Sequence, residues 1–141
     1  MIFDIRPFED SDTDAVVSLW EACELTRPWN NPVTDIQRKQ KLNDELFVVA
    51  YDGSRLVGSV MAGYEGHRGW INYLAVSPDF RKQGLGKALM QHVENKLLTI
   101  GCPKINLQIR AGNTDVIAFY ESIGFSDDNV SSFGKRLIPD E

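Results

Sequence analysis

The stretch at residues 77–89, SPDFRKQGLGKAL, decides the fold, and it follows the apolar run INYLAV at residues 71–76. Gly84 and Gly86 lie one residue apart among three basic residues, where a strand pattern gives way to a helical one. Unpaired N–H groups in the first turn of a helix bind anions, and glycine lets an anion approach the backbone closely. The stretch therefore predicts a strand, an anion-binding turn and a helix, in that order.

Two common nucleotide-binding motifs do not fit this turn. The sequence GLGKAL lacks the third glycine of the dinucleotide fingerprint, and Gly84 stands too close to Gly86 and Lys87 for a P-loop. These motifs therefore favour neither an NAD site nor an ATP site.

Periodic patterns continue on the C-terminal side of the turn. Apolar residues recur at helical spacing over 84–100, and Gly101 is placed to cap that helix. The sequence KINLQIR at 104–110 alternates as a strand does, and Asn113 begins a helix predicted to run to about Ile123. The sequence SSFGKRLI at 131–138 predicts a closing strand, which could pair within the sheet or across a dimer.

The N-terminal part predicts a strand at 3–8 and an amphipathic helix whose start carries Ser11 and Asp14 at capping-box spacing. The sequence TRPWNNP at 26–32 breaks this helix, and Thr34 opens a second, more polar helix that ends near Asn43.

A hairpin is the clearest strand signal in the chain. Two apolar runs within residues 46–64 are joined by Asp52-Gly53, and GHRGW at 66–70 then leads into the run at 71–76. Strands and helices in this order predict one mixed α/β sheet with helices against its faces.

Composition limits the classes of protein that fit. A chain of 141 residues suits one domain over 1–141, and a net charge of −5 argues against nucleic-acid binding. The first residues lack the pattern of a signal peptide and no apolar run is long enough for a membrane, so we expect a cytoplasmic protein. Cys23 and Cys102 lack the paired spacing of a metal or redox site, so we expect small buried thiols and no metal.

The turn resembles a known signature. The sequence AVSPDFRKQGLGKALM is similar to the motif of the GCN5-related N-acetyltransferases (GNAT), with Arg81, Gly84 and Gly86 at its Arg-x-x-Gly-x-Gly positions. A second family pattern follows in NTDVIAFYESIGF, carried by Asn113, Tyr120, Gly124 and Phe125. The two patterns occur in the family's order, separated by the expected helix and strand.

The resemblance implies an α/β (α+β) fold of the GNAT type: a mixed, mostly antiparallel central sheet with helices on both faces and a splayed cleft for acetyl-CoA. It implies transfer of an acetyl group from acetyl-CoA directly to a primary amine of a small molecule or a peptide. The order of elements is similar to that of the bacterial ribosomal-protein N-terminal acetyltransferases, although no residue fixes that substrate.

The resemblance also implies a cofactor site. Backbone groups of Leu74 and Val76 should pair with the pantetheine arm as an added strand would. The pyrophosphate should lie on the N–H groups of residues 83–87. The full set of predicted cofactor-binding residues is Leu74, Val76, Arg81, Lys82, Gln83, Gly84, Leu85, Gly86, Lys87, Asn113 and Phe119.

Direct attack by an amine needs an oxyanion donor and an acid for the departing thiolate. The resemblance implies Tyr120 as the acid and the Leu74 N–H as the donor; apart from it, Tyr120 is simply an aromatic packing residue. Some members of the family carry a glutamate on the strand before the signature, but WINYLAV at 70–76 has no carboxylate. Glu65 and His67 are the nearest titratable groups and either transfer the proton or belong to a solvated loop.

The connection between the first two helices borders the acceptor site in this family. Arg27, Trp29 and Asn30 lie there, and an arginine can hold a carboxylate while a tryptophan adds apolar area. Alternatively, Trp29 closes the end of the core and the two prolines stiffen the loop.

Two other hypotheses remain at the level of sequence. One is a non-catalytic module that binds acyl-CoA, suggested by the absence of a carboxylate on the strand. The other is a domain that binds a different phosphate ligand at the Gly84 turn.

Overall fold

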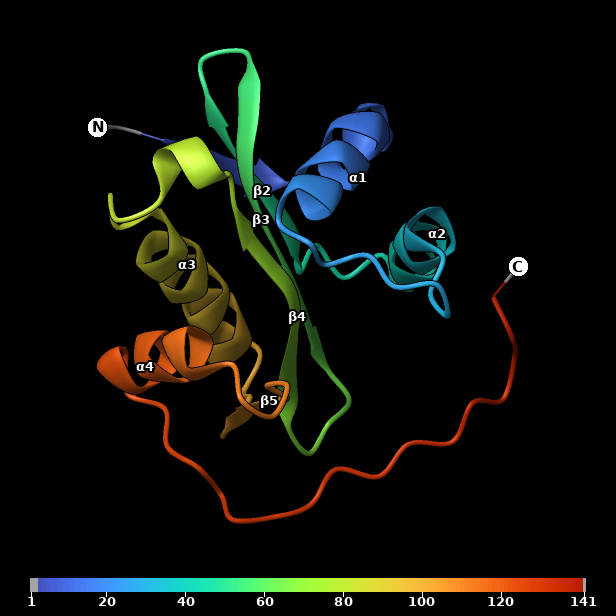
Figure 1. Ribbon diagram of the computed structural model, residues 1–141, viewed down its shortest axis with the longest axis vertical. Helices are drawn as coiled ribbons and strands as arrows, with labels where there is room; N and C mark the ends of the chain where they lie inside the picture. Colours follow the sequence, from blue (N-terminus) through green and yellow to red (C-terminus); the bar gives the residue numbers. More distant parts are fainter. Residues whose placement is uncertain (1–2, 141) are drawn as a thin grey trace.

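The computed structural model describes residues 3–140 as a five-stranded sheet with helices against both faces (Figure 1). The strands are β1 (Asp4–Pro7), β2 (Phe47–Asp52), β3 (Arg55–Tyr64), β4 (Gly69–Val76) and β5 (Ile105–Leu107). The helices are α1 (Thr13–Ala22), α2 (Pro32–Leu42), α3 (Leu85–Thr99) and α4 (Thr114–Ser122), with short 3-10 turns η1 (Asp10–Asp12) and η2 (Pro78–Phe80). Neighbouring strands follow chain order, and only β4 and β5 are parallel. The predicted mixed, mostly antiparallel sheet is confirmed.

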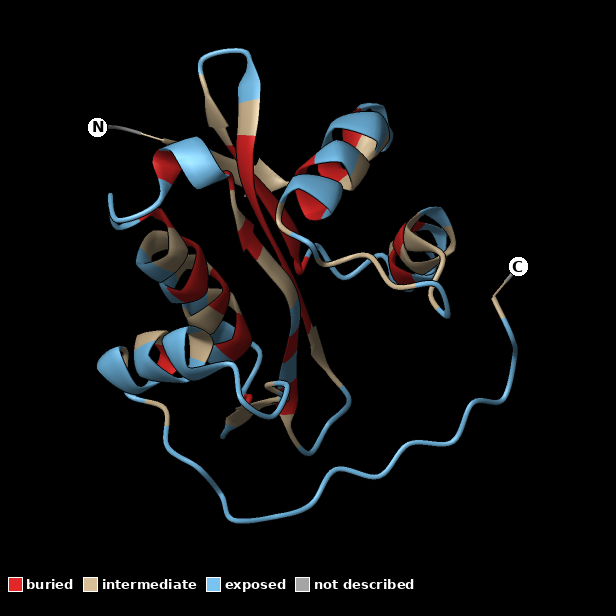
Figure 2. Ribbon diagram, viewed as in Figure 1, coloured by how far each residue is buried: buried red, intermediate tan, exposed pale blue. Residues whose placement is uncertain are grey.

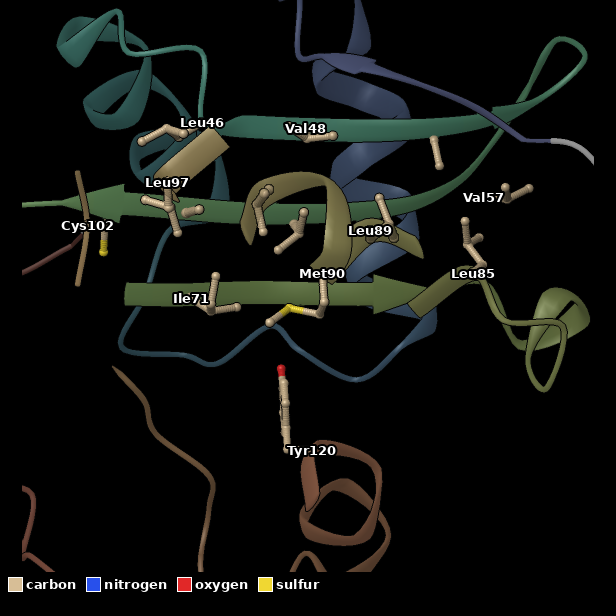
Figure 3. Close-up of a cluster of buried hydrophobic side chains, with 14 of the residues drawn as sticks. Leu46, Val48, Val57, Ile71, Leu85, Leu89, Met90, Leu97, Cys102 and Tyr120 are labelled. Atoms are coloured by element: carbon tan, nitrogen blue, oxygen red, sulfur yellow. The ribbon is translucent and has the colours of Figure 1, made fainter. Parts of the chain in front are cut away.

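The sheet has a separate hydrophobic cluster on each face. On one face the buried side of α3, including Leu89 and Val93, packs against Val48 and other strand residues, and α4 adds Tyr120 (Figure 3). On the other face Trp20 of α1 and Ile36 of α2 lie in a second cluster. Figure 2 shows both sets of helices directing their buried residues toward the sheet. Strand residues alternate between the two clusters, as the pleat requires.

The central hairpin forms as predicted. Strands β2 and β3 pair from Phe47 opposite Met61 to Asp52 opposite Arg55, so the turn lies at Gly53 and Ser54. Gly53 has a φ of 58°, which glycine adopts without steric cost.

The starts of the first two helices differ from the prediction. The capping box joins Glu9 and Asp12, not Ser11 and Asp14, because a turn of 3-10 helix precedes α1. Helix α2 begins at Pro32, where the missing N–H costs no helical bond, and the side chain of Asn31 accepts from the N–H of Val33 at 3.0 Å. Helix α2 therefore begins at Pro32, two residues before the predicted start at Thr34.

The predicted closing strand at 131–138 is wrong, and the strand predicted at 104–110 is limited to β5. Residues 126–140 contain no regular element, and Phe133 and Leu137 are 93% and 83% exposed. This tail is attached near β5 by side chains, through Lys104 to Asp128 and Gln108 to Ser132, and not by a backbone ladder. Alternation predicts that a segment can form a strand, but the ladder also needs a partner edge of matching length.

The two cysteines are free. Cys102 is buried, as predicted, whereas Cys23 is only half-buried, so the prediction of a buried thiol is wrong there. Among residues 3–140 no helix has the length and apolar character needed to cross a membrane.

Candidate active site

Strand β4 loses one of its two neighbours partway along its length. It pairs with β5 only from Gly69 opposite Ile105 to Ile71 opposite Leu107. Beyond Ile71 it still pairs with β3, but no strand within residues 3–140 covers its other edge. We call this uncovered stretch, residues 72–76, the open edge.

Backbone groups of Val76 and Leu74 face the open edge. The N–H of Ser77 donates to Val57 O at 2.8 Å, so alternation turns the N–H and C=O of Val76 away from β3. The C=O of Tyr73 accepts from Ser59 Oγ on the β3 side at 3.0 Å, which turns Leu74 the other way. The two backbones predicted to bind a pantetheine arm therefore lie where an added strand would pair.

A bulge lies near the start of the open edge. Tyr73 has a φ of 52°, and the pairing register of β3 and β4 shifts at this point. The fully buried Trp20 donates from Nε1 to Ser59 Oγ at 2.9 Å, and Ser59 in turn donates to the Tyr73 carbonyl. A buried polar relay from α1 through β3 thus holds the bulge in place, and no pattern in the sequence indicates it.

The turn between η2 and α3 presents unpaired donors. Lys82 and Gly84 have φ values of 62° and 81°, and the first helical bond runs from the N–H of Ala88 to Gly84 O. Within the described chain, the backbone N–H groups of 83–87 donate to no protein group, as expected of a helix N-terminus. Arg81 donates from Nε to Val76 O at 3.3 Å, which joins this turn to the end of the open edge.

Helix α4 packs against the start of α3, next to the Gly84 turn. A Cβ on Gly86 would lie 3.1 Å from Cζ of Phe119, so the glycine allows close contact between α3 and α4. Tyr120 is 8% exposed, and Figure 3 shows its hydroxyl end directed from α4 toward β4. Burial raises the pKa of Tyr120 to about 12, so its hydroxyl keeps its proton at neutral pH. Asn113 stands at the N-cap of α4 and is exposed.

The connection between α1 and α2 lies beside the open edge. Cys23 donates from Sγ to Val76 O at 3.3 Å, and the Arg110 guanidinium lies 5.7 Å from the centre of the Trp29 ring. Trp29 is 51% exposed, so it does not close the core. The connection, residues 23–31, therefore runs from the open edge to the segment after β5. We call it the acceptor-side wall.

Arg27 and Asn30 have different roles in this wall. The Arg27 guanidinium donates to its own loop, at Glu24 O (2.7 Å) and Thr26 O (3.1 Å). Asn30 Oδ1 accepts from Arg136 of the C-terminal tail at 2.6 Å. Of the three predicted acceptor residues, the structure thus leaves the Trp29 ring exposed, holds Arg27 within the loop and ties Asn30 to the tail.

A second polar group lies behind this wall, and the sequence analysis missed it. Tyr73 donates from its hydroxyl to Asp35 Oδ2 at 2.7 Å, while its ring stacks on Trp20 with centroids 3.7 Å apart. Burial, followed by the hydrogen bond and charge of Asp35, raises the pKa of Tyr73 well above its usual value. Arg38 Nη1 lies 3.5 Å from Asp35 Oδ1. The spacing of Asp35 and Arg38 on one helix could have been noticed, but their meeting with Tyr73 could not.

Glu65 and His67 are at the other end of β4. The Glu65 carboxylate accepts from the N–H groups of His67 (2.5 Å) and Arg68 (2.6 Å), so it shapes the turn before β4. The eight residues of β4 extend about 23 Å at a rise of ~3.3 Å per residue. The turn that carries Glu65 and His67 therefore lies a strand length from the Gly84 turn, and the structure does not bring these two side chains to it. Within residues 3–140 no cluster of three or more His, Cys, Asp or Glu side chains is arranged to hold a metal ion.

Comparison with known proteins identifies the class. The model of the acetyltransferase (GNAT) family matches residues 13–125. An acetyltransferase of Yersinia enterocolitica is 48% identical over 138 residues, which cover 98% of each chain. The structure of ribosomal-protein-S18-alanine N-acetyltransferase from Escherichia coli superposes with a TM-score of 0.74 at 24% identity, covering 89% of this chain and 78% of that one. Glucosamine-6-phosphate N-acetyltransferase from Arabidopsis thaliana gives 0.72 at 21% identity, covering 98% and 100%.

The family model and the curated relative define the class of this chain as an acetyltransferase. The chain belongs to the GNAT family of acetyltransferases. The two solved structures share its fold at low identity, and their different acceptors are properties of those proteins.

Proposed function

We propose that this protein transfers an acetyl group from acetyl-CoA directly to a primary amine of a small molecule or peptide. One observation carries the proposal: the open edge of β4 ends beside a helix N-terminus whose backbone N–H groups have no protein partner. An extended amide-bearing arm that ends in a pyrophosphate matches both halves of this surface.

The cofactor-binding roles follow from the backbone positions. The amides of the pantetheine arm would pair with Leu74 and Val76 on the open edge. The N–H groups of 83–87 would donate to the pyrophosphate, and the exposed Lys82 and Lys87 add positive charge in an otherwise acidic protein. Phe119 holds α4 against the turn through Gly86. Asn113 would contact the arm from the start of α4.

The chemistry requires one bond to form and one to break. The neutral amine attacks the thioester carbonyl, a C–N bond forms, and the Leu74 N–H donates to the developing oxyanion. As the C–S bond breaks, Tyr120 would donate its proton to the departing thiolate, and the proton lost from the amine nitrogen would return through solvent water to restore the Tyr120 hydroxyl. The raised pKa of Tyr120 suits this role because the hydroxyl is protonated before the step.

The binding-only alternative was based on the lack of a carboxylate on the strand. Asp35 bears on this point, since helix α2 brings its carboxylate to the hydroxyl of Tyr73 on β4. A carboxylate therefore lies next to the open edge although the strand itself has none. This contact favours a transferase over a cofactor sensor. We also propose that the whole chain forms a single domain.

The test combines a panel of acceptors with one substitution. Free thiol release from acetyl-CoA is measured with amino acids, polyamines, aminoglycosides and short peptides. With an active acceptor, Tyr120→Phe should lower kcat about 100-fold, in the range of general acid catalysis, and leave the Kd for acetyl-CoA within about threefold. Tyr64→Phe is the matched control, because Tyr64 bonds to Gly66 O and Gly101 O at the far end of the sheet.

Equal turnover in the Tyr120→Phe and wild-type proteins would remove Tyr120 from the acid role. Tight binding of acetyl-CoA with no acetyl transfer to any amine would instead support the sensor. A protein that does not bind acetyl-CoA at all would contradict both proposals.

A further inference from the structure

A carboxylate already occupies the start of α2. Asp140, near the end of the tail, accepts from the N–H of Asn31 at 2.8 Å and from Arg38 Nη2 at 2.9 Å. Arg136 lies 3.8 Å from the same carboxylate. The hydrogen bond from Asn31, followed by that from Arg38, keeps the pKa of Asp140 below its usual value. Arg38 and the Asn31 N–H thus form a carboxylate-binding position that the chain fills with its own side chain.

A partner for an ammonium group lies directly beside it. Asp35 precedes Arg38 by one helical turn, and its carboxylate lies 3.5 Å from the Arg38 guanidinium. The hydroxyl of Tyr73 holds Asp35 in place from β4. One face of α2 therefore offers an anion-binding group and a cation-binding group in contact with each other.

Asp35 is the one of these two groups that lies nearer to the open edge, because it contacts Tyr73. Tyr73 immediately precedes Leu74, whose backbone faces the open edge. Contacts therefore lead from Arg38 to Asp35 and on to Tyr73, which belongs to the edge where the thioester would lie. A molecule held by its carboxylate at Arg38 would direct a neighbouring amine toward Asp35 and the open edge.

We infer that the acceptor is a free amino acid, whose carboxylate binds Arg38 and the Asn31 N–H and whose amine lies at Asp35. The inference rests on the proposed function and narrows it. Polyamines and aminoglycosides lack the carboxylate, and the terminal carboxylate of a peptide lies too far from its amine. Asp140 is then an internal competitor that occupies the carboxylate position in the unliganded protein.

The experiment compares each L-amino acid with its own carboxamide, which keeps the amine and the side chain but removes the negative charge. Free acids should exceed their carboxamides by about tenfold or more in kcat/KM, since an ionised acceptor makes stronger hydrogen bonds than a neutral one. Arg38→Gln should lower kcat/KM for the free acids to the value for the carboxamides and leave the Kd for acetyl-CoA unchanged. Lys41→Gln is the matched control, since Lys41 is an exposed cation on the same helix.

The internal competitor gives an effect in the opposite direction. Asp140→Ala should lower KM for the free acids severalfold, because the side chain that fills the position is removed, and should leave KM for the carboxamides unchanged. An equal response of both substrate sets would contradict the role of Asp140.

A binding measurement separates this inference from the proposed function. In ¹⁵N-labelled Asp140→Ala protein, the Asn31 backbone amide signal should shift when L-amino acids are added, but not when their carboxamides are added. Adding Arg38→Gln should remove the shift. If transfer fails for every amine but this shift appears, the proposed function falls and the carboxylate position stands. If transfer occurs equally to acids and carboxamides, or the shift is absent, the inference is overturned.

Discussion

The proposed cofactor side and the proposed acceptor side of this site are built from different parts of the chain. On the cofactor side, backbone groups of β4 and the turn before α3 belong to one continuous stretch, residues 74–87, with Phe119 and Tyr120 packed against it. On the acceptor side, side chains of Trp20, Asp35 and Tyr73 come from three elements and meet through stacking and hydrogen bonds. The first depends on local geometry, whereas the second depends on the tertiary fold.

This difference determines which substitutions matter on each side. A backbone site tolerates changes of side chain except where glycine permits a close approach. A site of paired side chains loses function when one member of a pair is removed, because the other is left without its partner.

The largest loss of acetyl-CoA affinity is expected at Gly86, whose N–H is a proposed pyrophosphate donor and whose Cα packs closely against Phe119. Gly86→Val should weaken acetyl-CoA binding at least about 100-fold, or ~2.7 kcal/mol, because a Cβ there already lies 3.1 Å from Phe119 and the branches would crowd the unpaired N–H groups. Titration calorimetry measures the Kd. Gly134→Val is the control, since a Cβ at Gly134 meets no atom within 4 Å. An unchanged Kd for Gly86→Val would contradict a backbone site at this turn.

The cofactor side could be predicted from sequence because its signal is local. The glycine turn, the strand before it and the helix after it all formed where the pattern placed them. Two glycines, an apolar strand and a helical period suffice to specify such a turn. The same locality explains why Gly101 ends α3 as predicted, with a φ of 87°.

The acceptor side could not be predicted because its residues are far apart in sequence. Trp20, Ser59 and Tyr73 meet only when α1 packs across β3 and β4. Arg27 has the expected chemistry for binding a carboxylate, yet its donors are used by its own loop, whereas Arg38 is directed outward to Asp140. Side-chain type indicates what a residue can bind, but tertiary contacts decide which arginine is available.

The next largest effect should come from the buried relay. Ser59→Ala removes the acceptor of Trp20 Nε1 and a donor to the Tyr73 carbonyl, so it should lower the free energy of unfolding by about 2 kcal/mol. Urea unfolding measures this change. Ser18→Ala, at an exposed position of α1, should change stability by less than about 0.5 kcal/mol. A similar result for both variants would show that the bulge does not depend on the relay.

A smaller effect is expected from Tyr73→Phe, which keeps the stacked ring and removes only the bond to Asp35. Activity with the best acceptor should fall about tenfold in kcat/KM, or ~1.4 kcal/mol, while the Kd for acetyl-CoA stays unchanged. This split would assign the hydroxyl to the acceptor side. Loss of acetyl-CoA affinity would instead mean that the two sides are not separable at β4.

The smallest expected effect concerns Tyr120, which packs on the proposed cofactor side. Its pKa of about 12 means that it adds no phenolate absorbance near pH 10, where an ordinary tyrosine ionises. Alkaline difference spectra of the wild-type and Tyr120→Phe proteins should therefore coincide up to about pH 11 and separate above it.

The raised pKa also fixes the sign of a change in stability. Tyr120 ionises near pH 10 in the unfolded chain but near 12 in the folded one, so its contribution is intact below pH 10 and is lost as the pH rises from 10 to 12. Between pH 9 and 11 the wild-type protein should lose about 1 kcal/mol more stability than Tyr120→Phe, measured by urea unfolding, because the other tyrosines are common to both. Equal losses would mean that Tyr120 ionises as an exposed tyrosine does, and a hydroxyl so placed would lack the burial on which its role as a retained proton donor depends.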